Sequence, residues 1–255
     1  MLDNKKLKIS LVAFYGNKPL ELQQLIIELQ QLLQQQLASN FIPYDLEQIH
    51  ATIIGCEGIK TKAGIISKWF YELRNEIKYL NYAGLVNYFL TTKLLPLDIS
   101  FAGYKIQQDY QFYSNNQHPY YRSFQIKKSE TNILIPIVIG WSLKQIITTE
   151  LDTIRRDLEQ FNYLHKYHKL PQDIDNDLYL RIGTIKSNHS FDSIAAIQNQ
   201  IIDYLGNRAK TTVCLSKENL AFVQYQDLSL PISTTKIYPL AELKHKTKML
   251  RQLYR

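Results

Sequence analysis

Two side chains within residues 48–55, which read QIHATIIG, are suited to chemistry on a phosphate group. The isoleucines predict a short buried strand, and Gly55 closes it. His50 and Thr52 are two positions apart, so on a strand their side chains point to the same face. The imidazole can move a proton, and the hydroxyl can hold an oxygen. The pair would be one half of a site, unless His50 is a core histidine with a local hydrogen bond.

The surrounding elements must position this stretch. Residues 7–15 (LKISLVAFY) predict the first strand, and Pro19 opens an amphipathic helix that runs to about Leu37. Trp69 and Phe70 fit the core-facing stripe of a later helix, so we assign them to packing rather than to binding. Residues 63–88 are expected to be mainly helical, and residues 144–163 to form a further helix. Strands are expected over residues 97–104, 110–113, 124–127 and 133–141.

The second half of the chain repeats the order of the first, without evident sequence identity. Residues 178–186 (LYLRIGTIK) predict a strand, and Ser190 is placed to cap the helix that follows. Residues 211–215 and 220–226 are expected to form a hairpin, and residues 236–240 a last edge strand. Each half therefore has a long helix, a polar break, a strand that reaches a glycine, another helix and a group of strands.

Composition and charge leave several partner classes open. The chain has 255 residues, two cysteines far apart and a formal charge of +7. The last fifteen residues hold five basic side chains against one acid (Lys244, Lys246, Lys248, Arg251 and Arg255 against Glu242). Such a tail favours anionic partners, or it only keeps the chain in solution. No signal peptide is visible and no apolar run can span a membrane, so we expect a cytoplasmic protein without a membrane partner.

The chain resembles the 2H phosphoesterase superfamily, which includes 2'-5' RNA ligase-like proteins and cyclic phosphodiesterases. The resemblance rests on His50-Ala51-Thr52-Ile53 as a His-x-Thr-apolar motif, on the first strand before the first helix, and on residues 178–186, which lie where a second motif belongs. It implies an α+β fold of two lobes related by a pseudo-twofold axis, with two antiparallel sheets flanked by helices around a central cleft.

The resemblance also implies a mechanism and a substrate class. Two histidines serve as general acid and base, two hydroxyls hold the phosphate, and neither a metal nor another cofactor is needed. The implied substrates are RNA ends with a 2',3'-cyclic phosphate, or cyclic or 2'-5'-linked nucleotides. We expect residues 1–240 to form one two-lobed domain, with approximate halves 1–141 and 142–240, and residues 241–255 to form a basic tail.

The second motif carries different residues. Alignment on Gly183 puts Tyr179 where the resemblance implies a histidine and Arg181 where it implies a hydroxyl. Arginine is a good phosphate ligand, whereas tyrosine, with an unperturbed pKa of about 10, is a poor base at neutral pH. His189 follows this strand and is a candidate replacement. For the other histidines, no position relative to the motifs favours a role in the site (His118, His165 and His168).

Three functions remain open. In an enzyme, His50 is general acid or base, Thr52 and Arg181 hold the phosphate, and Tyr179 stands in for the missing histidine. In a binding module the same cleft holds a nucleotide or an RNA 3' end without turnover, with tyrosines that stack on bases. The third function is partner binding through a helix in the tail, whose apolar face is weak.

Overall fold

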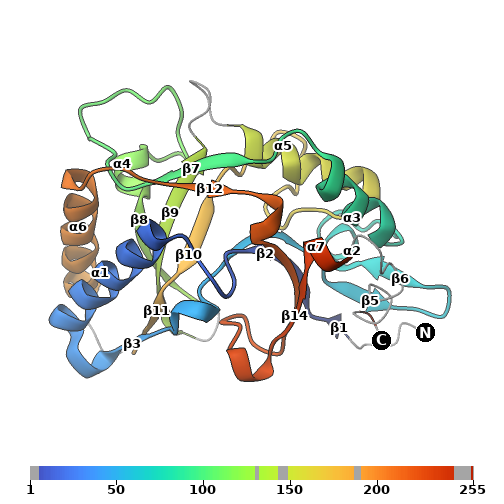
Figure 1. Ribbon diagram of the computed structural model, residues 1–255, viewed down its shortest axis with the longest axis horizontal. Coiled ribbons are helices and arrows are strands. Elements are labelled where there is room, and N and C mark those ends of the chain that lie inside the picture. Colours follow the sequence, from blue (N-terminus) through green and yellow to red (C-terminus); the bar gives the residue numbers. More distant parts are fainter. Residues whose placement is uncertain (1–5, 130–131, 143–148, 187–190, 244–253, 255) are drawn as a thin grey trace.

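The computed structural model describes residues 6–129, 132–142, 149–186, 191–243 and 254 (Figure 1). The chain has an α+β fold in which a large curled antiparallel sheet is combined with a small three-stranded sheet and with helices. The strands are β1 (Lys6–Leu7), β2 (Ile9–Ala13), β3 (Phe41–Pro43), β4 (Ala51–Gly55), β5 (Gly58–Lys60), β6 (Ile65–Ser67), β7 (Leu97–Phe101), β8 (Phe124–Lys128), β9 (Leu134–Ser142), β10 (Leu178–Arg181), β11 (Gly183–Ile185), β12 (Thr211–Leu215), β13 (Leu220–Gln224) and β14 (Lys236–Pro239). The α-helices are α1 (Leu20–Leu37), α2 (Lys68–Arg74), α3 (Tyr82–Thr91), α4 (Pro119–Arg122), α5 (Glu150–Asp157), α6 (Phe191–Asn207) and α7 (Leu240–Leu243), and the 3-10 helices are η1 (Ala38–Asn40), η2 (Leu46–Gln48), η3 (Leu158–Phe161), η4 (Lys217–Asn219) and η5 (Ile232–Thr234).

The large sheet has the strand order β12-β7-β9-β10-β4-β2-β13-β14, with β8 paired to β9 and with β11 paired to both β3 and β9. All of these pairs are antiparallel. The strands β4 and β10, which hold most of the candidate residues, are direct neighbours in the middle of this order. Strands β1, β5 and β6 make the small sheet beside it.

Helix α1 confirms the amphipathic pattern of its sequence. Its leucines and isoleucine at helical spacing are buried in the main core, beneath the sheet (Leu22, Leu25, Ile26, Leu29, Leu33 and Leu37). Helices α1 and α6 lie side by side on one flank of the molecule, and α2, α3 and α5 lie toward the other (Figure 1). Gln30 on α1 donates to the carbonyl oxygens of Tyr44 (2.8 Å) and Ile182 (2.9 Å), which fixes the helix against the end of β10.

The hairpin expected from residues 211–226 is wrong. Strand β12 pairs with β7 and strand β13 pairs with β2 and β14, so the two strands lie far apart in the order of the sheet. Between them, Ser216 and Asn219 cap the 3-10 helix η4 through reciprocal bonds between side chain and backbone. The polar residues reverse the chain, but they do not decide which strand each neighbour pairs with.

Residues 63–88, expected to be mainly helical, are helical only in part. The segment contains strand β6, helix α2 and helix α3. Asn75 ends α2 in the left-handed conformation, with φ 55°, and the Asn81 side chain caps α3 by accepting from Gly84 N. Asparagine tolerates left-handed backbone and caps helices, so both residues interrupt a run that hydrophobic spacing alone makes continuous.

Two other expected elements differ in extent. Residues 110–113 do not form a strand. The helix expected over residues 144–163 is described from Glu150, and it continues as α5 and then η3, which ends at Phe161. Residues 143–148 lie outside the described part of the chain, as does most of the basic tail. No helix among the described residues is long and apolar enough to cross a bilayer.

Candidate functional site

Strands β4 and β10 place the two candidate motifs next to each other. Ala51 pairs with Leu180 in an antiparallel register. Continued by one residue, this register puts Thr52 across from Tyr179 and His50 across from Arg181. An antiparallel pair has a local twofold axis perpendicular to the sheet. That axis relates His50 to Tyr179 and Thr52 to Arg181.

Alternation along β10 separates core from cavity. Leu178 and Leu180 are buried in the main core, whereas Tyr179 and Arg181 are half-buried on the opposite face. The sequence prediction that Tyr179 and Arg181 share one face is confirmed.

Strand β4 does not alternate regularly, because it contains a β-bulge. Val12 of β2 pairs with Thr52, and Leu11 pairs with Ile54, so Ile53 is an extra residue. Both isoleucines are buried, and Gly55 is brought to the same face as Thr52. The bulge therefore directs the end of β4, and Glu57 beyond it, toward the cavity.

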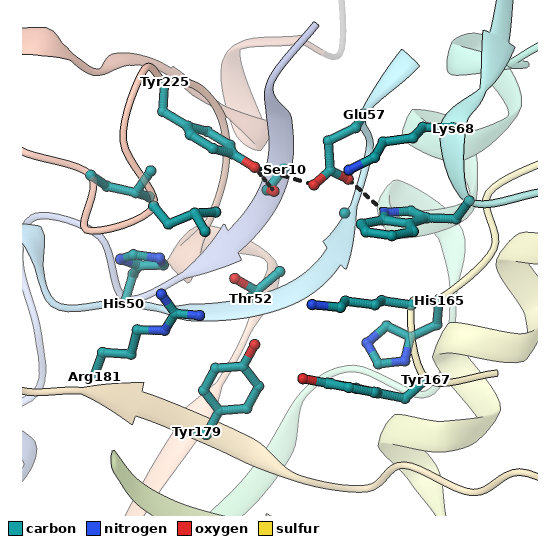
Figure 2. Close-up of a pocket in the computed structure, with 15 residues that line it drawn as sticks. Ser10, His50, Thr52, Glu57, Lys68, His165, Tyr167, Tyr179, Arg181 and Tyr225 are labelled. Carbon is teal, nitrogen blue, oxygen red and sulfur yellow. Dashed lines mark hydrogen bonds between the residues drawn. The ribbon is translucent and has the colours of Figure 1, made fainter. Parts of the chain in front are cut away.

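A cavity of about 240 Å³ lies on this face of the sheet (Figure 2). His50, Thr52, Tyr179 and Arg181 all line it, so the structure brings together every site residue predicted from the sequence. His50 and Arg181 lie at one end, and Thr52 and Tyr179 lie between that end and the other, with the Tyr179 hydroxyl directed toward Thr52 (Figure 2). Among the described residues, the Arg181 guanidinium has no hydrogen bond or ion pair.

His50 is held as a neutral imidazole. Its Nδ1 lies 2.7 Å from the carbonyl oxygen of Gln48, which can only accept, so Nδ1 carries the proton and Nε2 keeps its lone pair. Burial lowers the pKa of His50 to about 4; the hydrogen bond to Gln48 opposes this shift, and the charges of Arg181 and Lys18 add to it. The Tyr15 ring meets the imidazole edge-on at 6.0 Å between centroids. At neutral pH His50 is thus an oriented base.

Tyr179 is also neutral at pH 7. Burial raises the pKa of its hydroxyl, and the neighbouring Arg181 opposes part of that shift. Its ring packs against a buried aromatic cluster that includes Tyr104 and Trp141. The phenol can therefore donate a hydrogen bond or a proton from a fixed position, but it does not act as a base.

Arg155 on α5 joins the backbone of β4 to the segment just before β10. The side chain is fully buried. Its guanidinium donates to the carbonyl oxygens of Thr52 (3.2 Å) and Ile53 (2.9 Å), where the bulge leaves the ladder incomplete. It also donates to those of Asp175 (2.8 Å) and Asp177 (3.1 Å), just before β10. One side chain thus ties together the backbones that carry Thr52 and Tyr179.

The far end of the cavity contains residues that the sequence motifs do not indicate. Glu57 accepts hydrogen bonds from Trp69 Nε1 (2.8 Å) and from the Tyr225 hydroxyl (3.3 Å). Lys68, Lys166 and other side chains also line this end. Phe70 is buried in the protein, as its assignment to packing predicts, whereas Trp69 lines the cavity. Adjacent helical residues face different directions, and hydrophobicity alone does not distinguish them.

The other four histidines considered from the sequence lie in different places. His165 lines the cavity, and burial together with the nearby Arg155 holds its pKa well below the usual value. His118 caps α4 by accepting from Tyr120 N. His168 Nε2 lies 2.8 Å from Asp152 Oδ1, away from the cavity. His189 lies outside the described residues.

The described residues contain no group of three or more histidine, cysteine, aspartate or glutamate side chains that could hold a metal ion. A scan against models of known protein families finds no match, and no curated protein matches the sequence significantly. The function is therefore inferred from the geometry of the cavity.

Proposed function

We propose that the chain is a divergent 2H phosphoesterase-like protein that acts on a phosphodiester, such as a 2',3'-cyclic phosphate at an RNA end or a cyclic or 2'-5'-linked nucleotide. The observation that carries this proposal is the register of β4 and β10. Their local twofold axis relates His50-x-Thr52 to Tyr179-x-Arg181, and all four side chains line one cavity. In this proposal the sheet forms two pseudo-symmetric lobes around the cleft.

Phosphate binding follows from the donors that Arg181 and Thr52 offer to the cavity. The Arg181 guanidinium offers a planar pair of N–H groups that fits two phosphate oxygens. Thr52, beside it, offers a hydroxyl. Both groups face the cavity, and among the described residues neither side chain has a hydrogen bond or ion pair, so a phosphodiester would satisfy them. An anion there also offsets the cost of placing the guanidinium in a half-buried site.

Proton transfer is divided between the two strands. A water molecule attacks phosphorus while His50 Nε2 takes its proton, and the bond from phosphorus to the leaving ribose oxygen breaks. Tyr179 gives its proton to that oxygen, which as an alkoxide is a stronger base than a phenolate. The proton on His50 then returns to Tyr179 through solvent, which restores both groups. The base is a neutral imidazole and the acid is a neutral phenol, because burial lowers the pKa of His50 and raises the pKa of Tyr179.

A catalytically inactive module that binds a nucleotide or RNA is the second candidate. Its supporting observation is that both pKa values are shifted away from neutrality: that of His50 falls to about 4, and that of Tyr179 rises. Proton transfer is most efficient when the catalytic pKa lies near the working pH. The same shifts leave binding by Arg181 and Thr52 intact.

Turnover of 2',3'-cyclic nucleotides and of an oligoribonucleotide with a cyclic-phosphate end separates the two candidates. The assay contains EDTA and compares the unchanged chain with His50→Ala and Arg181→Ala. Turnover that disappears in His50→Ala supports the enzyme. Binding without turnover that disappears in Arg181→Ala supports the module. If the unchanged chain neither binds nor cleaves any of these ligands, the proposal is wrong.

A further inference from the structure

The far end of the cavity, formed by Glu57, Lys68, Trp69, Lys166 and Tyr167, has a positive charge that a single phosphodiester does not use. Lys68 Nζ lies 3.9 Å from the centroid of the Trp69 ring. Lys166 Nζ lies 5.7 Å from the centroids of both Trp69 and Tyr167. These cation–π contacts keep both ammonium groups at the cavity wall.

Trp69 is itself fixed in place. Its Nε1 donates to Glu57 Oε2, and the other oxygen of that carboxylate accepts from Tyr225. Gly55 makes room for this arrangement, because a Cβ there would collide with the Glu57 carboxylate and would come within 2.9 Å of Trp69 Nε1. The glycine in β4 thus leaves room for the Trp69 ring, which contacts both lysines.

The charges of the cavity do not balance. Three cationic side chains, Arg181, Lys68 and Lys166, line it with one carboxylate, Glu57. Lys68 has a carboxylate of Glu72 at 3.9 Å, whereas Lys166 has no ion pair among the described residues. After one phosphodiester is bound at Arg181, the side chains that line the far end, Lys68, Lys166 and Glu57, still carry a net positive charge.

The two ends are too far apart for one phosphate group. Thr52 marks the proposed diester site, and Gly55 lies beside the Glu57–Trp69 pair at the other end. Three steps along the bulged strand separate them, which is at most on the order of 10 Å. Figure 2 shows Lys68 and Tyr167 across the cavity from His50 and Arg181. A ligand that uses both ends must carry two anionic groups.

We infer that Lys68 and Lys166 form a subsite for a second phosphate group, so that the ligand is a phosphodiester with a further phosphate on the same molecule rather than an unsubstituted cyclic mononucleotide. This inference rests on the proposed function for the first phosphate. Glu57 orients Trp69 and also repels the second phosphate, which limits the affinity of the subsite.

The test compares two ligands that differ by one phosphate: adenosine 2',3'-cyclic phosphate and the same compound with a 5'-phosphate. Calorimetric titration in the His50→Ala chain gives Kd without turnover. We expect the 5'-phosphorylated ligand to bind roughly tenfold more tightly or better, since each phosphate contact to an ammonium is charge-assisted. The double variant Lys68→Met, Lys166→Met should remove this preference and leave the affinity for the unsubstituted ligand within about threefold.

Matched variants make the result specific. Lys93→Met removes an exposed lysine outside the cavity and should keep the preference, because the effect does not depend on total charge. Glu57→Gln keeps an oxygen for Trp69 and removes the negative charge, so it should increase the preference. Thermal melting checks that each variant is folded.

Two contrary outcomes have different meanings. Equal affinities for the two ligands, or a preference that survives in the double lysine variant, would overturn the subsite and leave the phosphodiester function standing. If neither ligand binds to the folded chain, the proposed function fails, and the second subsite fails with it.

Discussion

Strands β4 and β10 lie side by side with cleft residues at positions related by a local twofold axis, yet their side chains differ in chemistry. β4 and the residue before it offer the hydroxyl of Thr52 and His50, whose pKa is lowered to about 4. β10 offers Tyr179, whose pKa is raised by burial, and a permanent cation. The backbone geometry is thus more symmetric than the side chains it positions.

This difference assigns separate tasks to the two strands. His50 is the group of the four that can accept a proton at neutral pH, so removing it should abolish chemistry. Arg181 carries the permanent charge, so removing it should weaken binding. Tyr179 can assist either task by donation and is the least critical for both. Variants of these residues test this division of tasks, and their expected effects differ in size.

The largest expected effect is loss of turnover in His50→Gln. A positioned general base contributes about 10²–10⁴-fold to the rate, so kcat should fall by that factor while Kd for the ligand changes little. The control is His118→Gln, a histidine that caps α4 outside the cavity and should keep full turnover. Equal rates in His50→Gln and the unchanged chain would remove β4 from the mechanism.

The next largest effect is expected from the loss of Arg155, which joins the backbones of the two strand segments. Arg155→Met leaves four carbonyl oxygens without their donor, so the free energy of unfolding should fall on the order of 3–5 kcal/mol. Urea denaturation measures it. Arg156→Met is the matched control, because that partly exposed side chain pairs with Asp152 on the same helix and donates to one carbonyl oxygen, that of Asp173, so its loss should cost less, about 1 kcal/mol. Similar losses in both variants would contradict the role given to Arg155.

The pH dependence of stability tests the environment of β4. In the unfolded chain His50 titrates near its ordinary pKa of about 6.5, and in the folded chain at about 4. Between these values the unfolded state binds more protons, so stability falls as the pH falls through this window, by up to about 3 kcal/mol. His50→Gln should lack this part of the loss. The free energy of unfolding is measured by urea denaturation at pH 7 and pH 4.5 for both chains. An equal fall between the two pH values in both chains would show that His50 is not buried as described.

Sequence patterns predicted which residues share the cavity better than they predicted the rest of the fold. Period-two alternation determines which residues of β10 share a face, so the sequence alone is enough to place Tyr179 and Arg181 together. The amphipathic pattern predicted α1 for the same reason, since its buried stripe recurs at helical spacing.

Other features depend on contacts between distant segments. The extra residue Ile53 exists only relative to β2, so nothing local indicates that Gly55 and Glu57 face the cavity. Arg155 is an ordinary basic residue of an amphipathic helix until the carbonyl groups of two strands converge on it. The choice of β7 as the partner of β12 likewise depends on the curl of the whole sheet.

Arg181→Met tests the binding task of β10. Charge-assisted hydrogen bonds contribute about 1.5–3 kcal/mol, so Kd for a cyclic nucleotide should rise roughly 10- to 100-fold. Arg181→Lys keeps the charge without the planar pair of donors and should recover part of the affinity. Titration at two salt concentrations separates a bound phosphate contact from diffuse attraction, because screening weakens the second far more. Unchanged binding in Arg181→Met would place the phosphate elsewhere.

The smallest effect is expected from Tyr179→Phe, and this variant decides whether β10 takes part in proton transfer. The ring keeps its packing against the cluster with Trp141, and the variant loses one hydroxyl, which is worth about 0.5–1.5 kcal/mol. If Tyr179 protonates the leaving oxygen, kcat should fall while Kd stays nearly constant, and the loss should shrink for a substrate with a more acidic leaving group that needs no proton. If Tyr179 only contacts the ligand, Kd should rise for every substrate by the same factor. The first pattern makes β10 a participant in the chemistry, and the second restricts it to binding.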